Sequence, residues 1–172
     1  SNLFKRIIVV TNDLNRLIKK NYPKSVRIIK GGRERSDSSL IALKYIKKFK
    51  PVNLLIHDAA RPNFSIKLLK NLIYKLKKNR AVVPYIYSND SIKYKSQNQL
   101  FNLNRKKAFL TQTPQAFKFK DLYNLSSKQI TKVNDEATLF IENNYKITFI
   151  KGETKNKKIT YFDDIKLNKI SF

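Results

Sequence analysis

The chain has 172 residues, of which 41% are hydrophobic, enough for a full core, and we predict a single domain over residues 1–172. It contains no cysteine and one histidine, which excludes disulfides and thiolate metal sites. No apolar run approaches the length of a membrane span, and no signal-peptide pattern opens the chain. We therefore expect a cytoplasmic protein with no membrane partner.

The formal net charge is +25. Dense lysine attracts polyanions, so one interpretation is a basic nucleic-acid-binding module. The lysines are spread over predicted helices and loops, as in Lys47-Lys48 and Lys157-Lys158, and do not form one arm. This spread favours a solvated lysine surface with small anionic ligands over a nucleic-acid partner.

Apolar runs predict strands, and apolar residues at helical spacing predict the helices between them. The strands are expected at residues 7–10, 26–29, 52–56 and 81–86, and the helices at 14–18, 36–49, 68–76 and 120–126. Strand and helix alternate at βαβ spacing, which predicts an α/β class. The expected fold is Rossmann-like, with a mainly parallel sheet and helices on both faces.

Residues 87–107 break this alternation, because polar residues alternate there with apolar ones and show no helical period. The pattern predicts a two-stranded arm that projects from the sheet. An isolated hairpin is marginally stable in water, so the arm is expected to pack on something, most simply a second subunit. An ordinary surface hairpin is the alternative.

The hexapeptide from His57 to Pro62 follows the third predicted strand directly. Open α/β sheets bind ligands at the carboxyl ends of their parallel strands. Asp58 can hold a cation or hydroxyl groups there, the two alanines allow close approach, and Arg61 can clamp a phosphate. Four further polar segments accompany it, at residues 31–38, 111–115, 134–137 and 156–160.

In this order, the five segments resemble the 2-C-methyl-D-erythritol 4-phosphate cytidylyltransferase family, which transfers CMP from CTP to a polyol phosphate in isoprenoid precursor synthesis. The resemblance implies a nucleotide-diphospho-sugar transferase type of fold. It also implies Mg²⁺ or another divalent cation as cofactor, and a homodimer whose arm at residues 87–107 completes the partner's active site.

The resemblance also assigns roles to individual residues. The CTP-binding set is Gly31, Gly32, Arg33, Ser38, Asp58 and Ala59. The set for the polyol phosphate is Asp58, Arg61, Ser91, Arg105, Thr113, Asn134 and Lys158. Asp58, Arg105 and Lys158 are expected to be catalytic, and Asp58 is expected to hold the metal ion. His57 is expected to be structural, because an anionic phosphate nucleophile needs no base.

Several positions depart from the family pattern. Arg33 stands where the family often has aspartate or another polar residue, and Ser91 and Asn134 stand where it generally has threonine. The family's opening strand and its loop of the form Gly-x-Gly-x-Arg, which holds the triphosphate, have no counterpart among the three glycines. We therefore expect a chain that is incomplete at its N terminus and inactive by itself.

Three alternatives remain open from the sequence. D-ribitol-5-phosphate cytidylyltransferase shares the hexapeptide and the segment at residues 111–115, although the segment at 134–137 favours the methylerythritol enzyme. A catalytically inactive remnant would keep the fold and the dimer. The third alternative is the basic nucleic-acid-binding module.

Overall fold

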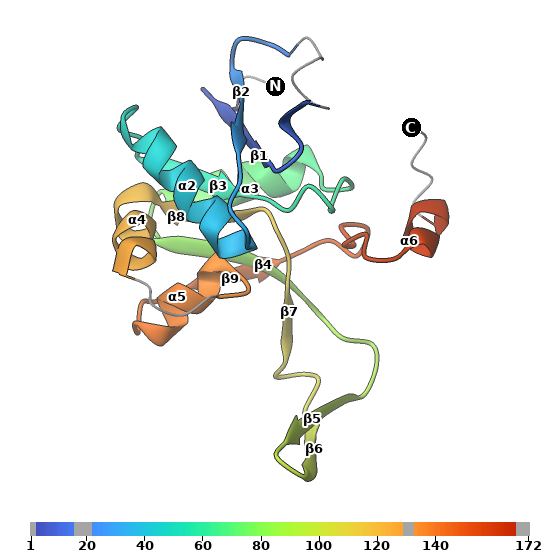
Figure 1. Cartoon of the computed structure of the whole chain (residues 1–172). Coiled ribbons are helices and arrows are strands. Elements are labelled where there is room, and N and C mark those ends of the chain that lie inside the picture. Colours follow the sequence, from blue (N-terminus) through green and yellow to red (C-terminus); the bar gives the residue numbers. More distant parts are fainter. Residues whose placement is uncertain (1–2, 16–21, 129–132, 168–172) are drawn as a thin grey trace. The chain divides into compact units, whose positions relative to one another are not determined.

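The computed structural model describes residues 3–15, 22–128 and 133–167 (Figure 1). These residues form two compact units. The first consists of Ser1–Val52 and Phe119–Asn144, and the second of Asn53–Lys118 and Tyr145–Phe172. A single domain over the whole chain stays a prediction.

In its described residues, the first unit combines a parallel strand pair with three helices. Its elements are β1 (Ile7–Thr11), β2 (Val26–Lys30), α2 (Arg35–Lys47), α4 (Phe119–Lys128) and α5 (Glu136–Glu142). Both strands are rich in isoleucine and valine, whose branched side chains suit a pleated surface. Helix α2 packs on β1 and on α4, and α4 packs on α5. The buried side chains of these helices include Leu43, Leu122 and Phe140.

The second unit is built on a five-stranded mixed sheet. Its strands are β3 (Asn53–Ile56), β4 (Ala81–Tyr87), β7 (Phe109–Thr111), β8 (Gln115–Lys118) and β9 (Thr148–Lys151). Strand β8 pairs antiparallel with both β3 and β4, so β3 and β4 run in the same direction. Strand β9 is parallel to β4, and β7 is antiparallel to it.

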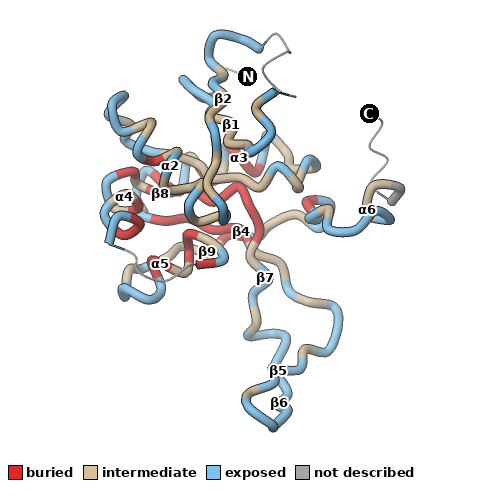
Figure 2. The backbone as a smooth tube through the Cα atoms, in the orientation of Figure 1, coloured by how far each residue is buried: buried red, intermediate tan, exposed pale blue. Residues whose placement is uncertain are grey.

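Helix α3 (Ile66–Leu76) covers part of this sheet, because its leucines recur at helical spacing along one face. The Ser65 side chain caps the helix by accepting a hydrogen bond from the Leu68 amide. Leu68, Leu72 and Leu76 are buried with Val82, Ala116 and Ile150 in one cluster. Figure 2 shows this buried centre along β4.

Two strands, β5 (Ile92–Ser96) and β6 (Gln99–Leu103), form a separate antiparallel hairpin. This hairpin confirms the predicted two-stranded arm, and Figure 1 shows it at the far ends of β4 and β7. Large apolar side chains on the hairpin are exposed, with Leu100 at 73% and Tyr94 at 52%. The short helix α6 (Phe162–Leu167) follows the main sheet in the sequence.

The α/β class is confirmed, and all four predicted strands are present. The predicted helices at 36–49, 68–76 and 120–126 correspond to α2, α3 and α4. The helix expected at 14–18 lies largely outside the described residues. The expectation of a mainly parallel sheet needs correction, because β8 is inserted between β3 and β4 with the opposite direction.

Across the described ranges, every helix is too short or too polar to traverse a lipid bilayer.

Candidate active site

The hexapeptide leaves strand β3 beside the turn that precedes β8. The β3–β8 ladder ends at the pair Ile56 and Gln115. Beyond it, the Asp58 amide donates to Thr113 Oγ1 over 3.0 Å, so a side-chain hydrogen bond continues the pairing of the two segments. The Thr113–Pro114 peptide is cis. Asp58 and Thr113, which both belong to the predicted polyol-phosphate set, are thus adjacent.

His57 links Thr113 to the turn at Arg61. Its Nε2 lies 2.9 Å from the Arg61 carbonyl oxygen, and its Nδ1 lies 3.1 Å from Thr113 Oγ1. A carbonyl can only accept, so Nε2 carries the proton. The ring also packs edge-on against Phe64. Burial lowers the pKa of His57 below its ordinary value of 6.5, which favours the neutral imidazole.

The Arg61 guanidinium is mostly enclosed by its own neighbours. Its side chain is 14% exposed, Nη1 donates to the Asn156 carbonyl over 2.9 Å, and Nε lies 3.7 Å from Asp58 Oδ2. Burial lowers the pKa of Arg61, while the Asp58 carboxylate raises it. Arg61 therefore holds Asp58 and the segment at Asn156 in place, in addition to any role toward a phosphate.

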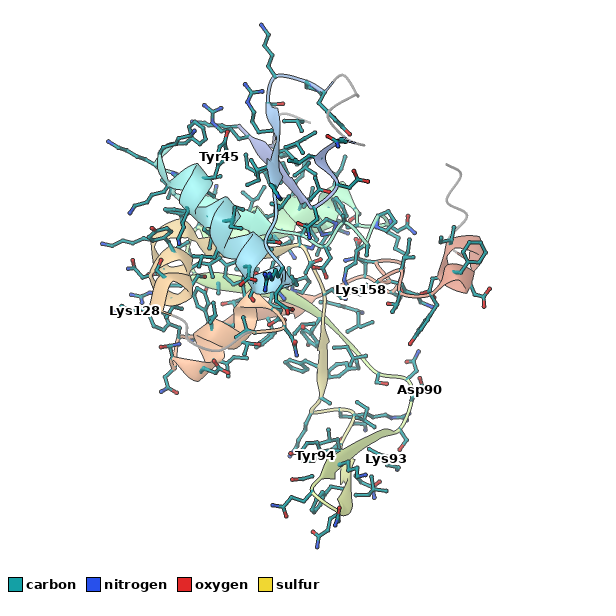
Figure 3. All side chains as sticks on the ribbon, in the orientation of Figure 1. Tyr45, Asp90, Lys93, Tyr94, Lys128 and Lys158 are labelled. Carbon is teal, nitrogen blue, oxygen red and sulfur yellow. The ribbon has the colours of Figure 1, made fainter. Side chains whose placement is uncertain are left out.

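Lys158 reaches the same carboxylate from the segment after β9. Its Nζ lies 3.8 Å from Asp58 Oδ2, and its side chain is 50% exposed. The amide of Ile159 donates to the Ala60 carbonyl over 2.8 Å, which fixes this segment alongside the hexapeptide. Figure 3 shows Lys158 in this segment, between β9 and α6.

A buried amide network supports these residues, and the sequence patterns did not reveal it. The Asn156 side chain, fully buried, donates to the Thr113 carbonyl over 2.8 Å. Gln112 Nε2 donates to the carbonyls of Glu153 and Asn156, and Gln112 Oε1 accepts from the Glu153 amide. A Cβ on Gly152 would overlap Gln112 Oε1, so glycine is required there. The sequence marked Gln112 and Asn156 only as members of the polar segments at 111–115 and 156–160.

Gly31 and Gly32 of the first unit lie in a loop that is held by hydrogen bonds from their backbone amides. The Gly32 amide donates to Ser38 Oγ over 3.1 Å, and the Gly31 amide donates to the Thr11 carbonyl. A Cβ on Gly32 would overlap Cβ of Asp37. Glycine is therefore needed at this position for space, since its φ angle is not positive. The Arg33 side chain is exposed.

An ion pair with a buried carboxylate joins the residues after this loop to the segment that contains Asn134. Arg35, the first residue of α2, donates from Nη1 and Nη2 to the two carboxylate oxygens of Glu136 over 2.9 and 2.8 Å. Ser39 donates to the same carboxylate. Glu136 is 2% exposed and begins α5, whose N-cap is Asp135. Asn134 itself is exposed.

Ser91 and Arg105 lie at the two ends of the arm. Ser91 Oγ accepts from Lys93 Nζ, and Arg105 Nη1 donates to the Asn89 carbonyl. Figure 3 shows Asp90 and Lys93 of the arm apart from Lys158. Of the predicted residues, the structure therefore groups Asp58, Arg61, Thr113 and Lys158 in one cluster. The arm residues belong to a separate part of the same unit.

The remaining predicted residues distribute between the two units. Gly31, Gly32, Arg33, Ser38 and Asn134 belong to the first unit. Ala59 belongs to the second, in the turn closed by the hydrogen bond from the Arg61 amide to the Asp58 carbonyl.

Comparison with known proteins identifies the relatives of this chain. The family model for 2-C-methyl-D-erythritol 4-phosphate cytidylyltransferase, IspD, matches residues 1–171. The bifunctional enzyme IspD/IspF of Pelagibacter ubique is 46% identical over 170 residues, which are 98% of this chain and 46% of that protein. The cytidylyltransferase of Thermosipho melanesiensis is 31% identical over 96% of this chain and 78% of its own length.

Among solved structures, 4-diphosphocytidyl-2C-methyl-D-erythritol synthase from Anaerococcus prevotii superimposes with a TM-score of 0.85 at 31% identity. The match covers 95% of this chain and 77% of that one. The chain thus spans about half the length of the bifunctional relative and about three quarters of the single-function relatives. These names support the methylerythritol assignment over the ribitol alternative. The chain belongs to the 2-C-methyl-D-erythritol 4-phosphate cytidylyltransferase family.

Proposed function

We propose that the protein transfers CMP from CTP to 2-C-methyl-D-erythritol 4-phosphate and releases pyrophosphate, a step in isoprenoid precursor synthesis. Family membership supports this proposal, and one structural observation carries it. Asp58, Arg61, Thr113 and Lys158 form a compact cluster of one carboxylate, two cations and a hydroxyl at the end of β3. Such a cluster suits a substrate that carries both a phosphate and several hydroxyl groups.

In the proposed reaction, a phosphate oxygen of the polyol attacks the α-phosphorus of CTP. A new P–O bond forms there, the bond from the α-phosphorus to the bridging oxygen breaks, and pyrophosphate takes that electron pair. The nucleophile is already an anion, so the protein needs to position it and to offset charge. Lys158, oriented by Asp58, is placed to hold the attacking phosphate as a point charge.

Asp58 is the one carboxylate of this cluster that could hold Mg²⁺. The ion takes few protein carboxylates and completes its coordination with phosphate oxygens and water, and Asp58 offers one partly buried carboxylate. Asp58 would therefore hold the ion together with the nucleotide phosphates. When bound, Mg²⁺ would neutralise the charge that develops on the leaving pyrophosphate.

The loop at Gly31 and Gly32 is proposed to bind the cytosine of CTP. Its backbone is fixed by the Gly32–Ser38 hydrogen bond and by Asn12 Nδ2, which donates to the Gly32 carbonyl. A preorganised loop lowers the entropy lost on binding. Since Arg33 is exposed, we assign the base contacts to the backbone of the loop.

The arm at residues 87–107 is proposed to form a homodimer and to bring Ser91 and Arg105 to the partner's site. The proposed compartment is the cytoplasm. Its exposed apolar side chains, Leu100 and Tyr94 among them, support this proposal. Sedimentation of the wild type is expected to give a dimer, and Leu100→Asp a monomer with reduced turnover. A wild-type monomer with full turnover would contradict the shared site.

The central experiment measures pyrophosphate release by the polypeptide expressed from the complete coding region. 2-C-methyl-D-erythritol 4-phosphate and D-ribitol 5-phosphate are compared side by side, with ATP in place of CTP as the nucleotide control. We expect turnover only with CTP and a clear preference for the methylerythritol substrate. Preference for ribitol phosphate would establish the alternative substrate, and no turnover with either polyol would indicate an inactive remnant.

A further inference from the structure

His57 is the only histidine of the chain, and the proposed reaction does not use it as a base. Its ring is nevertheless held on three sides. Nε2 contacts the Arg61 carbonyl, Nδ1 contacts Thr113 Oγ1, and the ring faces Phe64 with centroids 4.4 Å apart. An imidazole fixed in this way presents a defined donor and a defined acceptor to its neighbours.

The hydrogen-bond capacity of each atom determines where the protons lie. Nε2 donates to the Arg61 carbonyl, which leaves Nδ1 of the neutral ring as an acceptor. Thr113 Oγ1 already accepts the Asp58 amide proton, and its own proton points to Nδ1. The hydroxyl has one proton and two lone pairs, so only one lone pair remains unused in this network.

We propose that His57 is a positioning residue whose Nδ1 accepts the hydrogen bond donated by the Thr113 hydroxyl. Thr113 then offers a ligand an acceptor and no donor. This inference rests on the proposed function and deepens it. The substrate phosphate is mostly dianionic at neutral pH and therefore mainly accepts hydrogen bonds, whereas a polyol hydroxyl has a proton to donate. Thr113 therefore recognises a hydroxyl group of the polyol, and Lys158 is left to hold the phosphate.

The tautomer can be measured directly, because the pair of ring-nitrogen signals that disappears in His57→Gln belongs to His57. In ¹⁵N spectra of histidine-labelled protein at neutral pH, we expect a protonated Nε2 and an unprotonated Nδ1. Thr113→Val should shift the Nδ1 resonance, since it removes the hydroxyl that bonds to it. A protonated Nδ1, or no shift in Thr113→Val, would overturn the proposal. This readout does not depend on activity.

Two substitutions at His57 separate positioning from simple anchoring. Asparagine can place an acceptor near the site of Nδ1, and glutamine can place a donor near the site of Nε2. We expect His57→Gln to lower kcat/KM for the polyol phosphate by about tenfold or more, and His57→Asn to lower it less. The KM for CTP should change by less than about threefold in both variants. In the Thr113→Val background, the difference between the two variants should vanish.

Equal losses of kcat/KM in the two variants, or a larger loss in His57→Asn, would show that His57 only anchors the Arg61 carbonyl. Either result would contradict the proposal. Thermal unfolding of each variant checks that it is folded. If the wild type itself gives no turnover, the proposed function fails, and the ring-nitrogen spectra still decide the orientation of the hydroxyl.

Discussion

The Nζ atom of Lys158 lies 3.8 Å from the Oδ2 atom of Asp58. The lysine side chain is half exposed, whereas that of Asp58 is 18% exposed. An ammonium group has three donors, so one contact with a carboxylate leaves it capacity to bind a phosphate. The pair therefore orients a cation at the edge of the cluster without enclosing it.

Replacing Lys158 with alanine should reduce kcat/KM for the polyol phosphate, because the attacking phosphate loses its point charge. The expected loss is about 2–4 kcal/mol of transition-state stabilisation, comparable to removing one preorganised donor. Affinity for CTP, measured by calorimetry, should survive. Lys158→Arg should retain only part of the wild-type activity, since a planar guanidinium group does not replace the compact charge of an ammonium group.

The matched control for Lys158 is the exposed neighbour Lys157, which is expected to be solvated surface. Lys157→Ala should leave the kinetic constants close to those of the wild type. Equal effects of the two alanine substitutions would mean that general positive charge, and not the Asp58–Lys158 geometry, determines activity. The same scan with Arg105→Ala tests the predicted contribution of the arm.

The Gly32 loop should not tolerate a side chain. In Gly32→Ala, the added Cβ meets Asp37, so the loop must move and the hydrogen bond to Ser38 Oγ is strained. We expect the KM for CTP to rise by about tenfold, or about 1.4 kcal/mol. Lys30→Ala, on the exposed last residue of β2, should have little effect. An unchanged KM for CTP in Gly32→Ala would place the cytosine elsewhere.

The sequence predicted those parts of the fold that local patterns encode. Strands β1 to β4 and helix α3 follow from short apolar runs and from leucines at helical spacing. Strand β8 has only four residues and begins with a glutamine, so no period distinguishes it from a loop. Its place between β3 and β4 depends on pairing between distant segments, which a single sequence does not display.

The site divides in the same way. Asp58 and Arg61 were predictable because they directly follow a buried strand, and Lys158 because its segment resembles a family motif. The supporting roles of Gln112 and Asn156 were missed, since amide side chains that bond to main-chain carbonyls leave no sequence pattern. His57 was assigned a structural role, and its contact with Thr113 depends on the register of β3 and β8.

The Arg35–Glu136 ion pair should contribute substantially to stability. Arg35→Ala would leave the Glu136 carboxylate buried with the Ser39 hydroxyl and without its cation. Because the Arg35 side chain is 31% exposed, we expect a loss below that of a fully buried pair, about 1–3 kcal/mol, which urea unfolding can measure. Arg33→Ala, two residues away and exposed, should change the free energy of unfolding by less than about 0.5 kcal/mol. Similar unfolding curves for both variants would contradict a structural role for the pair.

Stability should decline as the pH falls below about 6.5, because His57 binds a proton more readily in the unfolded chain than in the folded protein. Burial lowers the pKa of the folded His57 below its ordinary value of 6.5, so the unfolded chain takes up the proton first as the pH falls. The free energy of unfolding therefore decreases between the pKa of His57 in the unfolded chain and its lower pKa in the folded protein. The slope of the free energy of unfolding is at most about 1.4 kcal/mol per pH unit. His57→Gln should remove the contribution of His57 to this slope just below pH 6.5, whatever its effect on stability at neutral pH. Urea unfolding at several pH values measures both curves. Parallel curves for the wild type and His57→Gln would show that another group titrates in this range.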